Sequence, residues 1–268
     1  MKKLVAGPWV GEFGYFLFTW QARLRWLSKN EYDEVVVVCR PGEEYVFEDF
    51  ADEILFWNQE CPDSAAGSKC KGFSFTDTYA VEGYDRILPN TRIAHYRWRK
   101  KEQPDPCFVD QDYRRFGAEL KAERYDVLLH IRTTEKVGQA YKNAFDGWDL
   151  LMDSFKGLKV ACIGIKAQAG LLAGADDKRG LPLRELAAVM AAAGVVVGAS
   201  SGPIHYAALC GLPQVTWVGR PLRRKSLRRY THHWNPFEVP VKPFFVKDWN
   251  PDTDVIIEAA HAILGAAI

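Results

Sequence analysis

Ser200, Ser201 and His205 have the chemistry and the spacing of a phosphate-binding turn. Gly202 permits a sharp bend after the two serines, and Pro203 suits the first position of a helix. The first N–H groups of a helix have no partner within it, and the positive end of its dipole attracts anions. We therefore expect Ser200, Ser201 and Gly202 to bind phosphate oxygens, with His205 donating to the same anion from one turn further along.

Two predicted strands position this turn. Val195 to Val197 form an apolar run short enough for a strand buried on both faces, and a second strand ends at Gly219. The helix would then begin beside the carboxyl end of a parallel strand. A purely structural interpretation stays open, because any doubly wound α/β domain contains such a turn, in which a histidine can simply cap or pack.

The whole segment from Gly194 to Gly219 resembles the C-terminal domain of glycosyltransferases of the GT-B fold, and is closest to the heptosyltransferase-like family 9. In that family a strand ending in Asp-Ser-Gly, or a near variant, precedes a His-containing helix and a second strand ending in Gly. The resemblance implies an α/β fold of two facing Rossmann-like domains and a site for the diphosphate of a nucleotide sugar. Ser200 stands where the family frequently has Asp.

The resemblance also implies a catalytic residue near the N-terminus. Gly11-Glu12-Phe13 occupies the place where family 9 enzymes carry Gly-Asp after the first strand. Gly11 would line the site, and Glu12 would be the base that removes the acceptor hydroxyl's proton during an inverting transfer. The alternative is a glutamate that lies near a helix N-terminus and is stabilised by the dipole alone.

By the same resemblance, the stretch His130 to Lys136, with Lys142 after it, lies where the family holds the donor phosphates. Arg132 offers a planar fork for two phosphate oxygens, Thr133 and Thr134 offer hydroxyls, and Lys136 or Lys142 offers a point charge. These groups would stabilise a departing nucleoside diphosphate without a metal ion. No cofactor is therefore expected.

Two further acidic features have competing interpretations. The resemblance places Glu185 where the nucleotide base and ribose are held, although it can equally be a surface charge in the first turn of a helix. Asp110-Gln111-Asp112 matches the Asp-x-Asp metal motif of the other major glycosyltransferase fold. It lies in an expected linker, where solvated turn carboxylates are the better explanation.

A strongly basic segment follows Gly219, and its six cations are Arg220, Arg223, Arg224, Lys225, Arg228 and Arg229. A solvated basic face is the usual explanation of such a segment. Its position at the edge of the expected cleft instead assigns Arg223 and Arg224 to a diphosphate or a polyanionic acceptor. His232 and His233 have no third ligand at a suggestive spacing, so no metal site is expected there.

Composition restricts the partners and the compartment. The formal net charge is +1, so general attraction of nucleic acid or anionic lipid is not expected. The six cysteines contain no C-x-x-C pair and are interpreted as reduced thiols in a cytoplasmic protein. No signal-peptide core and no apolar run long enough for a transmembrane segment is apparent.

Alternating strand and helix patterns predict parallel sheets covered on both faces. Strands are expected at residues 4–6, 35–39, 86–88, 125–132 and 159–164, besides the two beside the phosphate-binding turn. Helices are expected at residues 15–28, 148–155, 183–193 and 252–264, besides the one that begins at the turn. Residues 43–57 could supply another helix and a short strand.

These patterns divide the chain into three parts. Residues 1–120 would form an acceptor-side Rossmann-like domain, 121–250 a nucleotide-sugar-binding one and 251–268 a closing helix, with a linker near 103–122. The leading hypothesis is transfer of a sugar from a nucleotide-diphosphate donor to a saccharide or lipid-linked glycan. The alternatives are transfer to a modified DNA base, a non-catalytic nucleotide-sugar-binding protein, and an unrelated doubly wound enzyme that shares the phosphate-binding turn.

Overall fold

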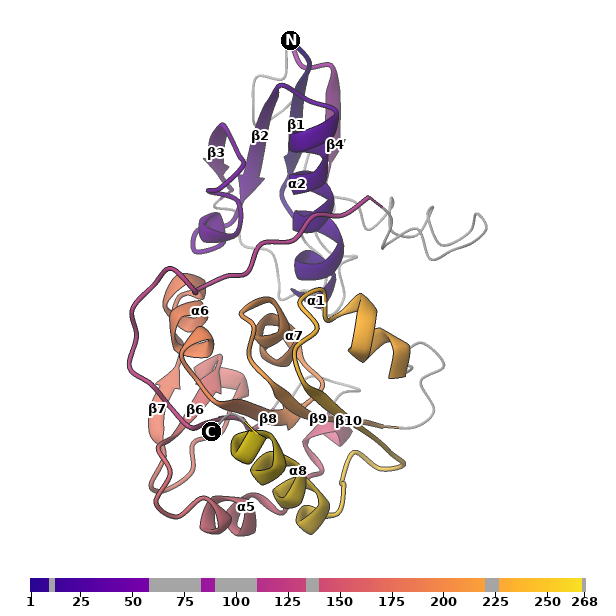
Figure 1. Cartoon of the computed structure of the whole chain (residues 1–268). Coiled ribbons are helices and arrows are strands. Elements are labelled where there is room, and N and C mark those ends of the chain that lie inside the picture. Colours follow the sequence, from indigo (N-terminus) through magenta and orange to yellow (C-terminus); the bar gives the residue numbers. More distant parts are fainter. Residues whose placement is uncertain (10–12, 58–82, 90–109, 134–139, 220–226, 267–268) are drawn as a thin grey trace. The chain divides into compact units, whose positions relative to one another are not determined.

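The computed structural model describes residues 1–9, 13–57, 83–89, 110–133, 140–219 and 227–266. The chain forms two compact units, Met1–Tyr113 and Arg114–Ile268 (Figure 1). Each unit contains a sheet in which every pair of strands is parallel, as the sequence predicted. The division lies inside the expected linker, upstream of residue 120. No helix among these residues is long and apolar enough to cross a membrane.

The first unit has a four-stranded sheet of order β3-β2-β1-β4. Its strands are β1 (Lys3–Gly7), β2 (Glu34–Cys39), β3 (Glu53–Phe56) and β4 (Arg86–Pro89). The helix predicted over residues 15–28 is a continuous helical stretch made of α1 (Phe13–Tyr15), a π-helical segment (Phe16–Trp20) and α2 (Gln21–Asn30). A short 3-10 helix (Glu44–Val46) precedes β3.

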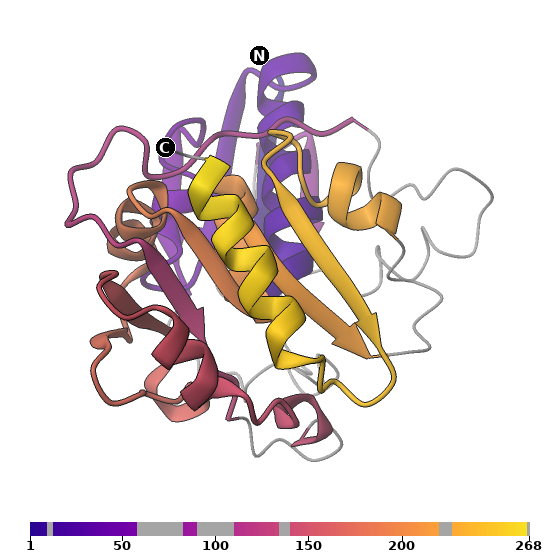
Figure 2. The same cartoon turned by 60° about the horizontal axis from the view of Figure 1, so that its bottom comes forward.

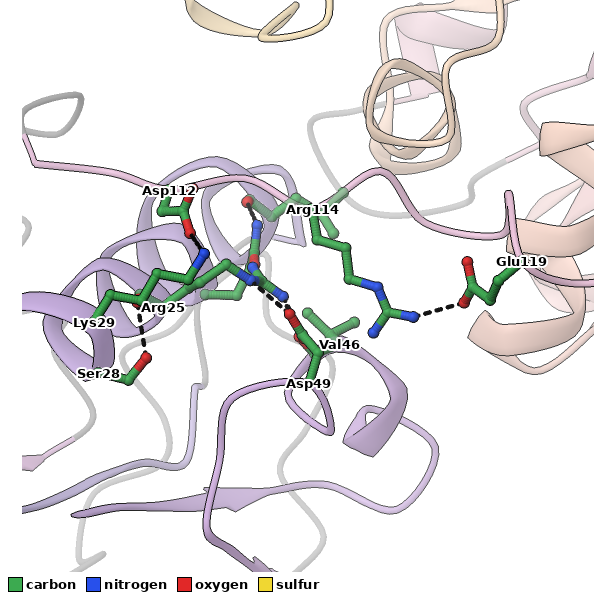
Figure 3. Close-up of polar contacts among 10 residues, drawn as sticks. Arg25, Ser28, Lys29, Val46, Asp49, Asp112, Arg114 and Glu119 are labelled. Atoms are coloured by element: carbon green, nitrogen blue, oxygen red, sulfur yellow. Dashed lines mark hydrogen bonds and ion pairs between the residues drawn. The ribbon is translucent and has the colours of Figure 1, made fainter. Parts of the chain in front are cut away.

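Apolar strands and one buried arginine stabilise the first unit. The side chains of the β2 valines are almost fully buried, which explains the uninterrupted apolar run. Arg25 on α2 is also buried, and its guanidinium donates to both carboxylate oxygens of Asp49 at 3.0 and 2.7 Å and to the Val46 carbonyl at 3.1 Å (Figure 3). This bidentate pairing satisfies a charge that would otherwise be costly to bury.

The second unit has a six-stranded sheet of order β10-β9-β8-β5-β6-β7. Its strands are β5 (Val127–His130), β6 (Val160–Gly164), β7 (Asp176–Arg179), β8 (Val195–Ala199), β9 (Gln214–Gly219) and β10 (Val241–Val246). Its helices are α5 (Trp148–Ser154), α6 (Leu183–Ala191), α7 (Gly202–Leu209) and α8 (Thr253–Ala266). Shorter 3-10 segments (Ala140–Asn143, Lys166–Gln168) and a π-helical segment (Arg229–His233) complete it.

Helices cover both faces of this sheet. α5 and α8 bury Leu151, Ile256 and Ala260 against Val195, Val197 and other core residues on one face. α6 and α7 lie on the other face, so that α8 runs across the front of the sheet and α7 behind it in the view of Figure 2. Burial on both faces explains why β5 and β8 are almost wholly apolar.

The segment that connects the units is tied to each of them separately. In the first unit, the Asp112 N–H donates to the Ala22 carbonyl at 3.0 Å, and its carboxylate pairs with Lys29 (Figure 3). Asp110 pairs with Arg23 at 3.1 Å. The two aspartates of the Asp-x-Asp triplet thus form partly exposed ion pairs with α2, a contact that sequence reasoning did not foresee.

The segment then docks on the second unit. The buried Phe116 donates its N–H to the Leu209 carbonyl at 2.9 Å, and its ring centroid lies 5.7 Å from that of Tyr206 on α7. Gly117 has φ +81°, and a Cβ there would lie 2.2 Å from the Ala187 carbonyl oxygen of α6. Only glycine allows the chain to approach α6 this closely with that backbone conformation.

Candidate functional site

The strand order of the second unit reverses between β5 and β8. From β5 the chain adds β6 and β7 on one side of the sheet, then returns to β8 and adds β9 and β10 on the other side. In open α/β sheets, ligands bind at the carboxyl ends of strands beside such a switch point. His130 ends β5 opposite Gly198 of β8, so Ser200 and Ser201 follow at this edge.

The two serines form the turn between β8 and α7. Ser200 donates its N–H to the Trp217 carbonyl at 2.8 Å, which holds the turn against β9. Ser201 is the N-cap residue of α7, with extended backbone angles, and Gly202 begins the helix. The positive end of the α7 dipole therefore lies at the switch point, as the sequence predicted for this turn.

Sequence reasoning placed His130 at the start of the donor-phosphate stretch but gave it no role, and the structure places it beside Ser201. The two side chains are buried, and the His130 Nδ1 atom is 2.9 Å from the Ser201 hydroxyl oxygen. Burial, with a further contribution from the positive charge of Arg132, lowers the pKa of His130 to about 4. The imidazole is therefore neutral near pH 7. The signal that could have identified it is a polar residue at the end of an otherwise apolar strand.

His205 lies in a cluster of aromatic rings from the residues that directly follow the basic segment. Its ring centroid is 4.6 Å from that of Trp234 and 6.4 Å from that of Tyr230. Tyr230 also donates its hydroxyl to the Ser200 hydroxyl oxygen at 2.7 Å. These contacts bring the π-helical segment Arg229–His233 against the phosphate-binding turn.

Arg132 and Thr133 lie just beyond β5, next to the loop that follows β6. Arg132 forms an isolated antiparallel bridge with Ala169, and the Thr133 N–H donates to the Gln168 carbonyl at 3.0 Å. Thr133 is exposed and Arg132 is half-buried. The structure thus places both residues at the carboxyl edge of the sheet, two and three residues after His130.

Lys142 contacts the ring of Trp249, which packs against the end of β9. Its ammonium nitrogen lies 5.5 Å from the ring centroid of Trp249. Trp249 in turn packs so closely on Gly219, the last residue of β9, that a Cβ at Gly219 would lie 1.9 Å from the indole nitrogen. This cation therefore lies at the carboxyl edge as well, although β8 lies between β9 and the switch point.

One described residue of the predicted site, Glu185, lies away from the switch point. Glu185 is exposed on the first turn of α6, which follows the edge strand β7, and this position fits the interpretation as a surface charge. Six residues that were assigned to the site lie outside the described part of the chain: Gly11, Glu12, Thr134, Lys136, Arg223 and Arg224. Of the six cations of the basic segment, the structure describes Arg228, which is exposed, and Arg229, which lies 5.7 Å from the Trp234 ring.

Among the residues that the structure describes, no three His, Cys, Asp or Glu side chains are grouped closely enough to hold a metal ion. His232 and His233 lie in the π-helical segment after Arg228. The carboxyl edge of the second sheet therefore offers hydroxyls, helix amides and cationic side chains as its binding groups. Such groups suit an oxyanion such as phosphate.

No protein-family model matches the sequence, and no curated protein matches it. Solved structures do match over almost the whole chain. A glycosyl transferase of family 9 from Veillonella parvula is 13% identical with a TM-score of 0.61, over 99% of this chain and 98% of that one. The E. coli heptosyltransferase WaaC, solved with ADP, is 11% identical with a TM-score of 0.60, over 98% and 100%. The E. coli ADP-heptose heptosyltransferase II is 14% identical with a TM-score of 0.59, over 100% and 99%.

At such low identities these matches concern the fold. The chain has the α/β fold of GT-B glycosyltransferases, and the resemblance to family 9 that the sequence indicated is confirmed at the level of structure. The matches extend over both units, whereas the motifs in the sequence covered only part of each.

Proposed function

We propose that this protein is a glycosyltransferase that moves a sugar from a nucleoside-diphosphate donor to an acceptor hydroxyl. One observation carries the proposal: the N-terminus of α7, with Ser200 and Ser201, lies at the switch point between β5 and β8. That is where an open α/β sheet binds a nucleotide. Support also comes from the similar fold of a heptosyltransferase solved with ADP.

In this proposal the second unit stabilises the leaving diphosphate. Negative charge grows on the phosphate oxygens as the bond to the anomeric carbon breaks. Amides at the start of α7 and the cations Arg132 and Lys142 would offset that charge, which lowers the energy of the transition state. We assign the same role to Thr133, Thr134, Arg223 and Arg224, and we assign no metal ion to this step.

The first unit would supply the base. β1 lies between β2 and β4, and the strand order of this sheet also reverses beside β1, because β2 and β3 lie on one side and β4 on the other. Glu12 follows the last residue of β1 by five positions in the sequence and directly precedes Phe13, the first residue of α1. We propose that Glu12 takes the acceptor's proton while the acceptor oxygen attacks the anomeric carbon from the face opposite the diphosphate, with inversion.

For the acceptor we propose a saccharide or a lipid-linked glycan. Nothing in the comparisons supports a DNA acceptor, and the formal net charge of +1 gives no general attraction to nucleic acid. A cytoplasmic location fits the buried, unpaired thiols of the three described cysteines, Cys39, Cys162 and Cys210.

A second candidate function is nucleotide-sugar binding without catalysis. The specific observation in its favour is that Ser200, which stands at the family's Asp position, accepts a hydrogen bond from the buried Tyr230. A hydroxyl pair therefore occupies the position of a carboxylate, and any step that needs a charge there is lost. Donor binding without turnover would identify this function.

A thermal-shift screen against nucleoside diphosphates and nucleotide sugars tests the proposal. A ligand present at 100 times its dissociation constant adds about 2.7 kcal/mol to the free energy of unfolding, so a true donor should raise Tm clearly. Donors that do so are then incubated with saccharide acceptors, and release of the nucleoside diphosphate is measured. Absence of a shift with every nucleotide would contradict both candidate functions.

A further inference from the structure

Ser201 occupies a capping position but does not cap its helix. Serine at an N-cap normally accepts a hydrogen bond from the N–H of the second or third helical residue. The Ser201 side chain makes no such bond, and its hydroxyl instead lies 2.9 Å from the His130 Nδ1 atom. The hydroxyl is thus directed toward β5 and away from the amides of α7.

The amides concerned can be identified individually. Pro203 has no N–H, and the His205 N–H donates to the Ser201 carbonyl at 3.0 Å. The donors of the first turn are therefore Gly202 and Ile204. Of these, the N–H of Ile204 is the one that an N-cap hydroxyl would reach, because it belongs to the third helical residue.

His130 has little freedom to move away from Ser201. A Cβ at Gly164 would lie 2.9 Å from the His130 Cδ2 atom and 3.1 Å from Nε2, and a Cβ at Gly198 would lie 3.1 Å from the His130 Cβ atom. Glycines on β6 and β8 thus leave just enough space for the ring on β5. The ring is held in one place by packing, with its Nδ1 atom toward the turn.

We propose that His130 is a positioning residue that holds the Ser201 hydroxyl off the N-terminus of α7, so that the Gly202 and Ile204 amides stay accessible to the donor diphosphate. This inference rests on the proposed function. Without His130, the hydroxyl would rotate to accept from Ile204 and would compete with a phosphate oxygen for that amide. His130 then acts on binding only through Ser201.

A double-mutant cycle tests this dependence. The variants His130→Leu, Ser201→Ala and the double variant are titrated with ADP and with inorganic pyrophosphate by calorimetry at pH 7.5. His130→Leu should weaken binding about tenfold, since an N-cap hydrogen bond is typically worth about that factor. The same substitution in the Ser201→Ala background should have no effect, because no hydroxyl is left to compete. A role confined to packing would instead weaken binding equally in both backgrounds, and that result would overturn the proposal.

A conservative variant and a spectroscopic measurement complete the test. His130→Asn keeps a polar atom near the position of Nδ1, and it should restore binding to within about twofold of the wild type. In the wild type, the ¹⁵N shift of the His130 Nδ1 atom should change on Ser201→Ala, and this readout does not depend on the leucine variant folding. An unchanged shift would overturn the proposal.

The two proposals fail in different ways. ADP binding with no coupling between His130 and Ser201 would overturn the role of His130 and leave the proposed function intact. Coupled binding of pyrophosphate without binding of any nucleotide would keep the role of His130 and overturn the nucleotide donor. Binding of neither ligand would overturn both.

Discussion

Glu12 is the single residue on which the proposed transfer chemistry depends most. Glu12→Gln removes the base but keeps the size of the side chain, so we expect kcat to fall by about 10² to 10⁴-fold. The dissociation constant for the donor should stay unchanged, because the diphosphate is assigned to the second unit. Both quantities are measured with the best donor and acceptor from the screen.

The control for that variant is Glu258→Gln, on the exposed side of α8. This substitution removes a carboxylate of the same kind from a surface position, and turnover should not change. Normal turnover in the Glu12 variant would show that another residue is the base. Glu185 is a separate case: if it contacts the ribose, Glu185→Gln should weaken nucleotide binding and leave the proton transfer unaffected.

The residues of the site were only partly predictable. Ser200, Ser201 and His205 lie in one short segment, so their grouping at one helix start could be inferred from sequence. His130 was not assigned a role, because its hydrogen bond joins residues 71 positions apart and depends on which strands are neighbours. For Glu185, sequence reasoning left a ribose contact and a surface charge open, and the structure shows the residue exposed on the first turn of α6.

Among the structural elements, the docking of residues 116–117 on α6 and α7 offers a clear stability prediction. Gly117→Ala should lower the free energy of unfolding by about 2 to 4 kcal/mol, because the new methyl meets the Ala187 carbonyl and the backbone has φ +81°. Unfolding in urea, followed by tryptophan fluorescence, measures the change.

Gly157→Ala is the matched control. Gly157 has φ +86°, but a Cβ there would meet no atom within 4 Å. Its substitution should cost only the backbone strain, about 1 kcal/mol. The difference between the two variants reports the crowding against α6, and equal effects would show that Gly117 is not tightly docked.

The elements that the sequence did not reveal share a cause: both lie at sheet edges. β7 has the sequence Asp-Asp-Lys-Arg and pairs only with β6, so no apolar face marks it as a strand. β10 contains Pro243, which normally argues against a strand, but the strand pairs with β9 alone and needs no second set of hydrogen bonds. The buried central strands were predicted because burial on both faces requires apolar runs.

For the molecule as a whole, we predict opposite responses of the two units to acid. His130 has a folded-state pKa of about 4, below its usual value, so its stabilising effect is complete above pH 6.5 and is lost as the pH falls toward 4. The free energy of unfolding lost in this way is on the order of 3 kcal/mol.

In the first unit the sign is opposite. Burial raises the pKa of Glu43 to about 6, so its contribution to stability is complete below pH 4.5 and is lost as the pH rises through 6.

Hydrogen exchange measured at pH 7 and pH 5, corrected for intrinsic rates, checks this prediction. Peptides from β5 and β8 should lose protection at the lower pH, whereas peptides from β2 should gain it. His130→Asn should abolish the first change and Glu43→Gln the second. Parallel changes in both units, or changes that survive these substitutions, would show that other groups determine the response.

The connection at Tyr113–Arg114 is a position at which genetic recombination could exchange one unit for another. All described residues before it belong to one unit and all those after it, including α8, belong to the other. Each flank also carries its own anchors, since Asp112 is tied to α2 and Phe116 to α7. A genetic crossover at this one peptide bond would therefore exchange a complete unit without dividing a core, so the two units can be recombined as separate modules.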